Sequence, residues 1–448
     1  MAMLSVEAQN RIKQLNPWMI HPENAEGLIS RFLPKEYVTR DIEQMRLQKD
    51  RAILVIGPRQ SGKSTLVWYL LRKFAPDIIF LNMEDPLLRA EVVSPFDFVE
   101  NVWGNYPFIK AIFIDEIQHM EEAGFFIKGL VDAKIGLPIW VTGSSSFHLR
   151  SMTRESLAGR AIRRMLLPFS LRELLAHAKP PNPVAARNIC EKIVFHQLTF
   201  GSYPAIYLAK DYDTKILLLN ELVEALILRD ASDLFRIKRV DAFRKLLTLL
   251  AGQISSLVNV SELASLCNVD VGTINAYIEI LDESHIVKRI RPFAIGKRRE
   301  ITGAPKVFFI DNGIRNQLLN NFYRELDLRT DKGELLENWV FGEIYKALPL
   351  QSSLKFWRSK AGAEVDFIVE HTGHIFALEV KFASLKRPKL SKSARSFMEA
   401  YVPNKFAVVN MTLEQTIEVE PTEVSFLTPF TLSQWLDRIL GHDISYNL

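Results

Sequence analysis

Four short, uninterrupted apolar runs mark the first part of the chain, and polar stretches with helical periodicity separate them. They cover residues 52–56, 78–81, 111–114 and 138–142. Apolar runs without polar alternation are typical of parallel strands that helices cover on both faces. Residues 66–71 continue the first run as a helix, and the charged residues 1–50 predict one or two helices over 23–48. The pattern therefore predicts an α/β domain built on a parallel sheet.

The middle of the chain is helical before it becomes mixed. Residues 185–239 have helical periodicity that the sequence Gly-Ser-Tyr-Pro at 201–204 interrupts, which predicts a small helical lid. The next stretch has the order of a winged helix-turn-helix. Its predicted elements are a helix over 241–254, a brief strand over 258–260, a helix over 262–267 capped by Ser261, a helix over 272–284, and strands over 286–293 and 307–310.

The C-terminal third predicts another α/β arrangement, in which one helix precedes three strands. The predicted elements are a helix over 333–348, strands over 354–357, 364–368 and 375–381, a helix over 392–401, a strand over 405–409, and a last strand and helix within 416–448. The proline-rich residues 175–184 mark an earlier domain edge.

The turn after the first apolar run reads GPRQSGKST, the P-loop spacing of one glycine, four residues and Gly-Lys-Ser. Its glycines let backbone amides turn inward around a phosphate chain, and the following helix adds its positive end. Lys63 is expected to reach the β- and γ-phosphates, and the Ser64 hydroxyl to ligate Mg²⁺. ATP and Mg²⁺ are the predicted cofactors. The predicted nucleotide-binding residues here are Gly57, Pro58, Arg59, Gln60, Ser61, Gly62, Lys63, Ser64 and Thr65.

Two carboxylates follow the third apolar run directly, as in the Walker B pattern. Asp115 is predicted to hold Mg²⁺ beside Ser64, and Glu116 to orient and polarise the attacking water. A polar side chain after the fourth run can touch the γ-phosphate, and Ser144 or Ser145 is the candidate.

The sequence allows two interpretations for several arginines, one at the nucleotide site and one as an ordinary structural or surface charge. Arg160 is a candidate to neutralise charge on the transferred phosphoryl group, in cis or in trans, and a structural salt bridge is the alternative. Arg31 and Arg40 could face a nucleotide, but solvated helix charges are the favoured interpretation. Arg229 and Asp230 either face the ATP site or form a helix-surface ion pair.

Seven segments occur in order and at ordinary spacings: GPRQSGKST, FLNMEDP, IFIDEIQ, VTGSSS, SLAGR, LPFSLREL and GSYPA. Over nearly its whole length the chain resembles a widespread bacterial and archaeal family of AAA-like P-loop ATPases that carry a C-terminal nuclease-like domain. Ser61 stands where many members carry valine, a neutral change because only the backbone is needed there. The resemblance implies an ATPase core joined to a winged helix and a nuclease-like domain.

The C-terminal element order, with Asp366 on one strand and Glu379-Val380-Lys381 on the next, resembles the PD-(D/E)xK nuclease superfamily. The two-residue strand period puts Glu379 and Lys381 on one face. Asp366, Glu379 and the Val380 carbonyl could bind Mg²⁺, which prefers oxygen ligands, with Lys381 stabilising charge or assisting the base. Glu337 would add a ligand or orient a water. The motif's proline is absent, since Val365 precedes Asp366.

The predicted winged helix carries its charge in the wing. The helix residues expected to enter a DNA groove, Thr273, Asn275 and Tyr277, are not basic. Cationic wing residues suit phosphate contact without strong base reading. Docking to protein is the alternative use of this domain. The wing cations are Lys288, Arg289, Arg291, Lys297, Arg298 and Arg299.

Composition narrows the class of protein. The chain has 448 residues, 48% hydrophobic and 24% charged, as in ordinary multidomain globular proteins. A net charge of +4 permits contact with nucleic acid without arguing for it. Cys190 and Cys267 stand far apart, which fits a reducing compartment. No transmembrane run or signal-type N-terminus is evident, so we expect a cytoplasmic protein without membrane contact.

These patterns predict an α/β protein in which ATP hydrolysis controls DNA engagement by a winged helix and a metal-dependent nuclease-like domain. One alternative is a DNA motor, such as a branch-migration enzyme, that does not cleave. Another is a nucleotide-dependent signalling switch. The sequence is compatible with a homo-oligomer. The predicted domains are a helical segment (1–45), the P-loop ATPase core (46–175), the lid (176–239), the winged helix (240–325) and the nuclease-like domain (326–448).

Overall fold

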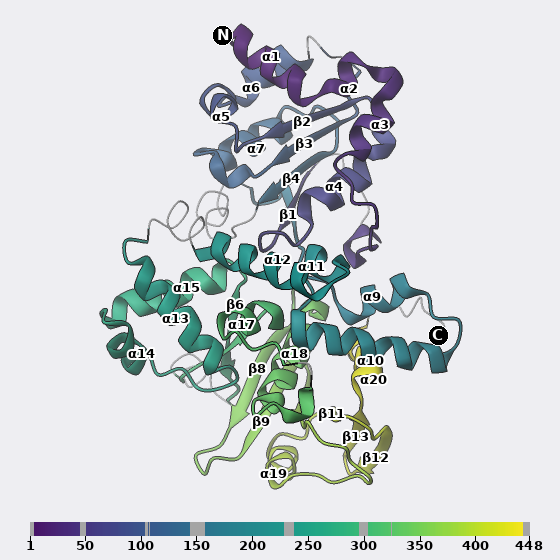
Figure 1. The fold of residues 1–448 in the computed structure, drawn as a ribbon, viewed down its shortest axis with the longest axis vertical. Coiled ribbons are helices and arrows are strands. Elements are labelled where there is room, and N and C mark those ends of the chain that lie inside the picture. Colours follow the sequence, from purple (N-terminus) through teal and green to yellow (C-terminus); the bar gives the residue numbers. More distant parts are fainter. Residues whose placement is uncertain are drawn as a thin grey trace. The chain divides into compact units, whose positions relative to one another are not determined.

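The computed structural model describes residues 4–44, 51–103, 106, 108–143, 157–227, 237–294, 303–323 and 325–441. The chain forms two compact units, and the main division falls between Leu167 and Pro168 (Figure 1). Among the described residues, every helix is too short or too polar to cross a bilayer.

A parallel sheet forms the centre of the first unit, with the strand order β2-β3-β4-β1-β5. The four predicted apolar runs are four of its strands, and their predicted ends agree with the structure to within one residue. The fifth strand, at the edge, was not predicted. The strands are β1 (Ala52–Ile56), β2 (Ile78–Asn82), β3 (Ala111–Asp115), β4 (Ile139–Gly143) and β5 (Ala161–Met165).

Helices cover both faces of this sheet, so its apolar strands bury two separate cores. Leu54 and Ile114 belong to one core, whereas Val55 and Phe113 belong to the other. Figure 1 shows the two helical layers on either side of the strands. The first layer holds α1 (Val6–Leu15), α5 (Pro86–Glu91), α6 (Pro95–Phe98) and α7 (Ala123–Asp132), and the second holds α2 (Pro17–Ile20), α3 (Ala25–Ser30) and α4 (Lys63–Leu71).

Single helical turns complete the described part of this unit. They are η1 (Pro22–Asn24), η2 (Asp41–Gln44), η3 (Arg72–Phe74), η4 (Val99–Trp103) and η5 (Ile117–His119). The stretch 23–48, predicted to be one or two helices, therefore contains the end of η1, the helix α3 and the single turn η2 within its described part.

The second unit begins with helices around one hydrophobic core. Residues such as Leu219, Leu246 and Leu281 meet the strand residues Val287 and Phe309 in this core. The helices are α9 (Leu171–Ala178), α10 (Pro183–Phe200), α11 (Pro204–Leu208), α12 (Tyr212–Glu224), α13 (Val240–Gly252), α14 (Val260–Cys267), α15 (Val271–Glu283) and α17 (Asn312–Leu318).

An eight-stranded sheet spans the rest of this unit, in the order β12-β13-β11-β10-β9-β8-β6-β7. Strand β6 pairs with β7 in antiparallel fashion and with β8 in parallel at Arg291 and Pro292, so the predicted wing continues the C-terminal sheet. The strands are β6 (Val287–Pro292), β7 (Lys306–Phe309), β8 (Ser353–Arg358), β9 (Glu364–His371), β10 (His374–Val380), β11 (Lys405–Val409), β12 (Gln415–Val419) and β13 (Thr422–Leu427). The accompanying helices are η7 (Leu326–Leu328), α18 (Lys332–Ala347), α19 (Lys392–Tyr401) and α20 (Pro429–Leu440).

Three local predictions are wrong. Asn259, not Ser261, caps α14, because its side chain accepts the Glu262 N–H. Residues 258–260 form no strand, and the neighbouring Leu257 makes an isolated bridge to Lys306. The last segment holds an antiparallel pair of strands, β12 and β13, where one strand was predicted.

His196 gives the second unit a pH-dependent stability. Its ring contacts Phe200 and Tyr207, and Nδ1 lies 3.2 Å from the Gly201 carbonyl oxygen. Burial, together with the charge of Lys215, lowers the pKa of His196 to about 4. An unfolded chain titrates a histidine near pH 6.5, so it takes up this proton before the folded chain does. The stability that the neutral ring supports is therefore present above pH 6.5 and lost as the pH falls toward 4.

We predict that His196→Phe removes about 2 kcal/mol of the loss in unfolding free energy between pH 7 and pH 5, because it deletes this proton uptake. Chemical denaturation of both proteins at the two pH values measures the difference. His374→Phe, at an exposed histidine of β10, is the control. Equal pH dependence of the wild type and His196→Phe would contradict the prediction.

Candidate nucleotide site and acidic cluster

The carboxyl edge of the first sheet gathers the residues that the sequence predicts for nucleotide chemistry. Because β1 lies beside β4 and β4 beside β3, the segments that follow these strands meet at one edge. The P-loop follows β1, Asp115 ends β3, and Thr142 lies next to the last residue of β4. Ligands of open α/β sheets bind at this edge.

Two glycines let the P-loop backbone take its path. A side chain at Gly57 would place its Cβ 2.1 Å from the Leu166 carbonyl oxygen, so only glycine fits there. Gly62 precedes α4 with φ of 92°, a conformation that favours glycine. Lys63 is 4% exposed, and its Nζ donates to the carbonyls of Gly57 (3.2 Å) and Pro58 (2.8 Å). The lysine is thus held within the loop it was predicted to serve.

Asp115 is the centre of a hydrogen-bonded group. The Ser64 hydroxyl donates to its Oδ1 at 2.9 Å, and the Thr142 hydroxyl donates to the same oxygen. Thr142 Oγ1 in turn accepts the Glu116 N–H at 3.3 Å. The structure therefore brings together Ser64 and Asp115, the two predicted Mg²⁺ ligands. Thr142, which sequence reasoning treated only as part of a strand, links both acidic residues.

Burial raises the pKa of Asp115 to about 6, and the neighbouring Glu116 charge raises it as well. The hydrogen bonds from Thr142 and Ser64 and the charge of Lys63 act in the opposite direction. A buried carboxylate of this kind gains from a nearby cation, because the cation offsets the loss of hydration. The hydroxyl and carboxylate oxygens suit Mg²⁺, a hard cation.

Glu116 sits in a left-handed backbone conformation, with φ of 53°. The buried Gln118 donates from Nε2 to Glu116 Oε2, which orients the carboxylate. Glu84 and His119 lie close by. Among the described residues, these two and Glu116 are the one group of three or more potential metal ligands whose atoms lie within 4.8 Å of one another.

The structure places Arg40 beside the P-loop, where it contacts the backbone. Arg40 is 5% exposed and donates to the Ser61 carbonyl (3.1 Å) and the Leu167 carbonyl (2.6 Å), so it supports the P-loop backbone. The interpretation of Arg40 as a solvated charge is therefore wrong. Its burial could not be seen in a stretch whose other charges are largely exposed.

Arg160 precedes β5 and lies at the edge of the sheet opposite the P-loop, because Ala161 pairs with Ala52, the first residue of β1. Its Nε donates to Asp132 at 2.6 Å, and both side chains are more than a third exposed. This geometry matches the salt-bridge alternative and separates Arg160 from the nucleotide site of its own chain. Ser144 and Ser145, and the pair Arg229 and Asp230, lie outside the described residues.

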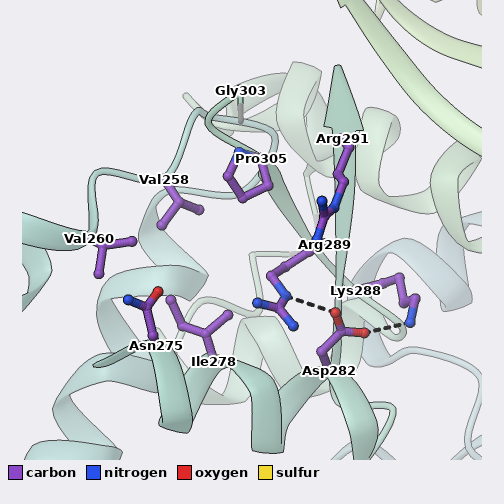
Figure 2. Close-up of a pocket in the computed structure, with 10 residues that line it drawn as sticks. All are labelled: Val258, Val260, Asn275, Ile278, Asp282, Lys288, Arg289, Arg291, Gly303 and Pro305. Carbon is purple, nitrogen blue, oxygen red and sulfur yellow. Dashed lines mark hydrogen bonds and ion pairs between the residues drawn. The ribbon is translucent and has the colours of Figure 1, made fainter. Parts of the chain in front are cut away.

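A cavity of about 240 Å³ lies between α15 and β6 in the second unit (Figure 2). Asn275 lines it from α15, and Arg291 lines it from β6. Asp282 pairs with Lys288 at 2.5 Å and with Arg289 at 2.9 Å, as the dashed lines in Figure 2 mark. Three cations and one carboxylate thus line a cavity next to the predicted recognition helix.

The other predicted helix residues do not line this cavity. The Thr273 hydroxyl donates to Asp270 at 2.6 Å, at the start of α15. Tyr277 is 7% exposed and packs against Phe243, so its prediction as a groove-facing residue is wrong. The wing residues Lys297, Arg298 and Arg299 lie outside the described residues.

The C-terminal sheet brings Asp366 and Glu379 onto adjacent antiparallel strands, as predicted. Leu378 pairs with Phe367, so Glu379 and Asp366 follow at the next register position. Asp366 accepts the Val380 N–H at 2.7 Å, and Glu379 Oε1 lies 3.4 Å from Lys381 Nζ. Glu379 Oε2 is buried and has no hydrogen-bond partner among the described residues.

A lysine that sequence reasoning missed enters this cluster from β7. Lys306 is 2% exposed, its Nζ lies 3.4 Å from Glu337 Oε1, and it also contacts the Glu364 carboxylate. Burial raises the pKa of Glu337 to about 6, and burial with the Glu337 charge raises that of Asp366. Burial would lower the pKa of Lys306, but the carboxylates around it raise it above its usual value.

Family comparisons match three parts of the chain. Residues 49–175 match the family described as an AAA domain. Residues 191–325 and 332–428 match two families described as domains of unknown function, DUF8612 and DUF4143.

Uncharacterised relatives cover most of the chain. A protein of Mycobacterium tuberculosis is 27% identical over 400 residues, which span 88% of this chain and 82% of the relative. A Methanocaldococcus jannaschii protein is 25% identical over 342 residues, which span 74% of this chain and 75% of the relative.

Solved structures give weaker likenesses. The Thermotoga maritima RuvB Holliday junction branch migration motor has a TM-score of 0.25 at 15% identity, over 60% of this chain and 89% of that one. Cdc6p from Pyrobaculum aerophilum has a TM-score of 0.27 at 12% identity, over 66% of this chain and 99% of that one. Strand order, P-loop geometry and the AAA-domain match together identify an AAA-like P-loop ATPase core in residues 49–175.

Proposed function

We propose that the chain is an ATP hydrolase whose first unit controls how the second unit engages DNA. The observation that carries ATP use is the 2.9 Å contact between the Ser64 hydroxyl and Asp115, beside the P-loop lysine. A helix-start hydroxyl and a strand-end carboxylate in contact are the Mg²⁺-holding pair of P-loop ATPases.

In the proposed reaction, the P-loop amides and Lys63 bind the phosphates of ATP, and Ser64 and Asp115 hold Mg²⁺. Bound Mg²⁺ supplies positive charge to the phosphate oxygens. Glu116 orients the attacking water, and the Gln118 hydrogen bond limits the positions that its carboxylate can take. Thr142 fixes both acidic residues through one hydroxyl. Arg160 could neutralise charge on the transferred phosphoryl group only at the nucleotide site of another copy of the protein, in a homo-oligomer.

For the second unit we propose a lid of α10, α11 and α12, followed by a winged helix of α13, α14, α15, β6 and β7. The support for DNA contact is the cavity between α15 and β6, where Lys288, Arg289 and Arg291 outnumber the one carboxylate, Asp282. Cationic side chains beside a polar helix residue such as Asn275 suit phosphate contacts, which position a protein on DNA without reading sequence.

We further propose that the C-terminal sheet is nuclease-like. Its support is that Asp366 and Glu379 come from adjacent strands and that Lys381 directly follows the second of them. The unpaired Glu379 Oε2 and the carboxylate donors suit a divalent cation, which Asp366 and Glu379 would hold. Such a cation would polarise a phosphate, and Lys381 would stabilise the charge that develops there.

A second candidate function is DNA remodelling without cleavage. The observation that favours it is the contact of Lys306 with Glu337 and Glu364. Glu337 was predicted to add a metal ligand or orient a water, and here its carboxylate is paired with an ammonium group instead. In this case the C-terminal domain would bind DNA, and ATP hydrolysis would drive strand displacement or branch migration.

We predict that Lys63→Ala abolishes ATP binding, whereas Glu116→Gln still binds ATP but hydrolyses it at least about a hundredfold more slowly, because only the water-orienting carboxylate is lost. Fluorescent-nucleotide binding and single-turnover hydrolysis separate the two effects. A Glu116→Gln protein with normal turnover would assign the water-orienting role to another residue.

Thr142→Val should lower ATP turnover by about 10- to 100-fold, the usual effect of losing an outer hydrogen bond to a metal-binding carboxylate. Valine keeps the size of the side chain, so the packing of β4 is retained and the loss of turnover reports on the missing hydroxyl. Thr142→Ser keeps the hydroxyl and is the control, expected to stay near wild-type turnover. Similar losses in both variants would mean that packing, not the hydroxyl, matters.

The two candidate functions predict different results with branched and duplex DNA in the presence of ATP and Mg²⁺. If the domain cleaves DNA, Glu379→Ala and Lys381→Ala lose cleavage, while Glu423→Ala, which breaks a separate carboxylate–lysine pair in the same sheet, retains it. If it only remodels DNA, ATP-dependent strand displacement survives in Glu379→Ala and no product is cut. Cleavage unchanged in both site variants would remove the nuclease proposal.

A further inference from the structure

The acidic cluster of the second unit contains its own cation, delivered by a strand far from it in sequence. Lys306 lies on β7, Glu337 on α18 and Glu364 on β9. The lysine is 2% exposed, and its Nζ lies over the Phe356 ring, 5.4 Å from the ring centre. A fully buried lysine is rare unless it is paired, and Lys306 has two carboxylate partners.

We propose that Lys306 is the resident cation of this cluster, and that its ammonium fills the place a divalent metal ion would take between Glu337 and Glu364. The Glu337 and Glu364 side chains are only 16% and 26% exposed, so their carboxylates repel each other and gain from compensating positive charge. An ammonium group bound to the chain supplies that charge whenever the protein is folded, without depending on the metal concentration. Glu337 is then a partner of Lys306 and not a metal ligand.

Backbone pairing on both sides of Lys306 fixes the point from which its side chain starts. Lys306 pairs with Ile290 of β6 on one side and bridges to Leu257 on the other. The flanking bonds from Val258 N to Pro305 O (2.9 Å) and from Ser255 N to Val307 O (3.2 Å) extend this pairing. Pairing on both edges of the strand fixes the Cα of Lys306, and the contacts with Glu337, Glu364 and the Phe356 ring hold its ammonium group.

Glu364 has a second cationic partner besides Lys306. Arg358 Nη1 lies 3.4 Å from Glu364, so this glutamate keeps one cationic contact when the lysine is removed. Glu337 has no ion pair other than Lys306 among the described residues. Removing the ammonium should therefore leave Glu337 uncompensated, and a divalent cation becomes its replacement.

This inference goes beyond the proposed function, because it concerns the charge balance of the cluster and holds whether or not DNA is cut. The charges of Lys306 and Glu337 act on Asp366, so the cation proposed for Asp366 and Glu379 would be a neighbour of this cluster. The two proposals are told apart at residues that contact one lysine each: Glu379 beside Lys381 for the nuclease proposal, and Glu337 beside Lys306 for this one.

Mn²⁺ titration of the full-length, nucleotide-free protein, followed by the EPR signal of free Mn²⁺, tests the proposal. Lys306→Met removes the charge but keeps the length of the side chain, and it should bind one more Mn²⁺ per chain than the wild type. Adding Glu337→Gln to Lys306→Met should abolish the extra ion. Lys355→Met, which breaks the 2.6 Å pair with Glu370 in the same sheet, is the matched control and should bind as the wild type does.

Thermal unfolding gives a second measurement. Mn²⁺ should raise the unfolding temperature of Lys306→Met but not that of the wild type or Lys355→Met. Equal Mn²⁺ binding by the wild type and Lys306→Met would overturn the proposal. If Lys306→Met does not fold, Glu337→Gln alone decides: unchanged Mn²⁺ binding relative to the wild type supports the proposal, and weaker binding overturns it, because Glu337 would then be a metal ligand.

Discussion

A charge removed from water must find a partner inside the protein, and both units of this chain are organised by that constraint. Asp115 is 8% exposed and Lys306 is 2% exposed, so neither can rely on hydration. Breaking a buried ion pair by deleting one partner leaves an uncompensated charge and is strongly destabilising. The side chains around these two groups are therefore constrained in position as well as in type.

The two units meet this constraint by different routes. In the first unit the partners of Asp115 come from the ends of neighbouring strands and from the adjoining helix, so the parallel strand order alone brings them together. In the second unit the partners of Lys306 come from α18 and β9, and the four strands β7, β6, β8 and β9 must assemble before they meet. The first site follows from local sequence and sheet order, and the second requires the tertiary fold.

This difference explains how far the sequence could predict the structure. The four buried strands and the P-loop were found because their apolar runs and glycine spacing are local. Strand β5 was missed because its sequence, AIRRM, is an edge strand with half-buried polar side chains and no apolar run. Arg40, Thr142 and Lys306 were missed as site residues because their roles come from long-range contacts.

Lys306 carried no local signal of its role. It begins the apolar run KVFF, where a lysine usually marks the polar end of a strand with its charge in solvent. Only the pairing of β7 with β6, and of β6 with β8, turns that end into the interior of a larger sheet. The alternation along a strand predicts which face of the sheet each side chain lies on. It does not predict which other strands and helices then cover that face.

The antiparallel ribbon of β6 and β7 joins the acidic cluster to the cationic cavity. Arg289 and Arg291 flank Ile290 in β6, and Ile290 lies opposite Lys306 in β7. Successive strand residues point to opposite faces, so the cavity arginines and Lys306 lie on opposite faces of one ribbon. Moving the ribbon toward a ligand in the cavity would pull Lys306 from its buried carboxylates, at a high cost in free energy. We therefore expect β6 and β7 to keep their position when the cavity is occupied.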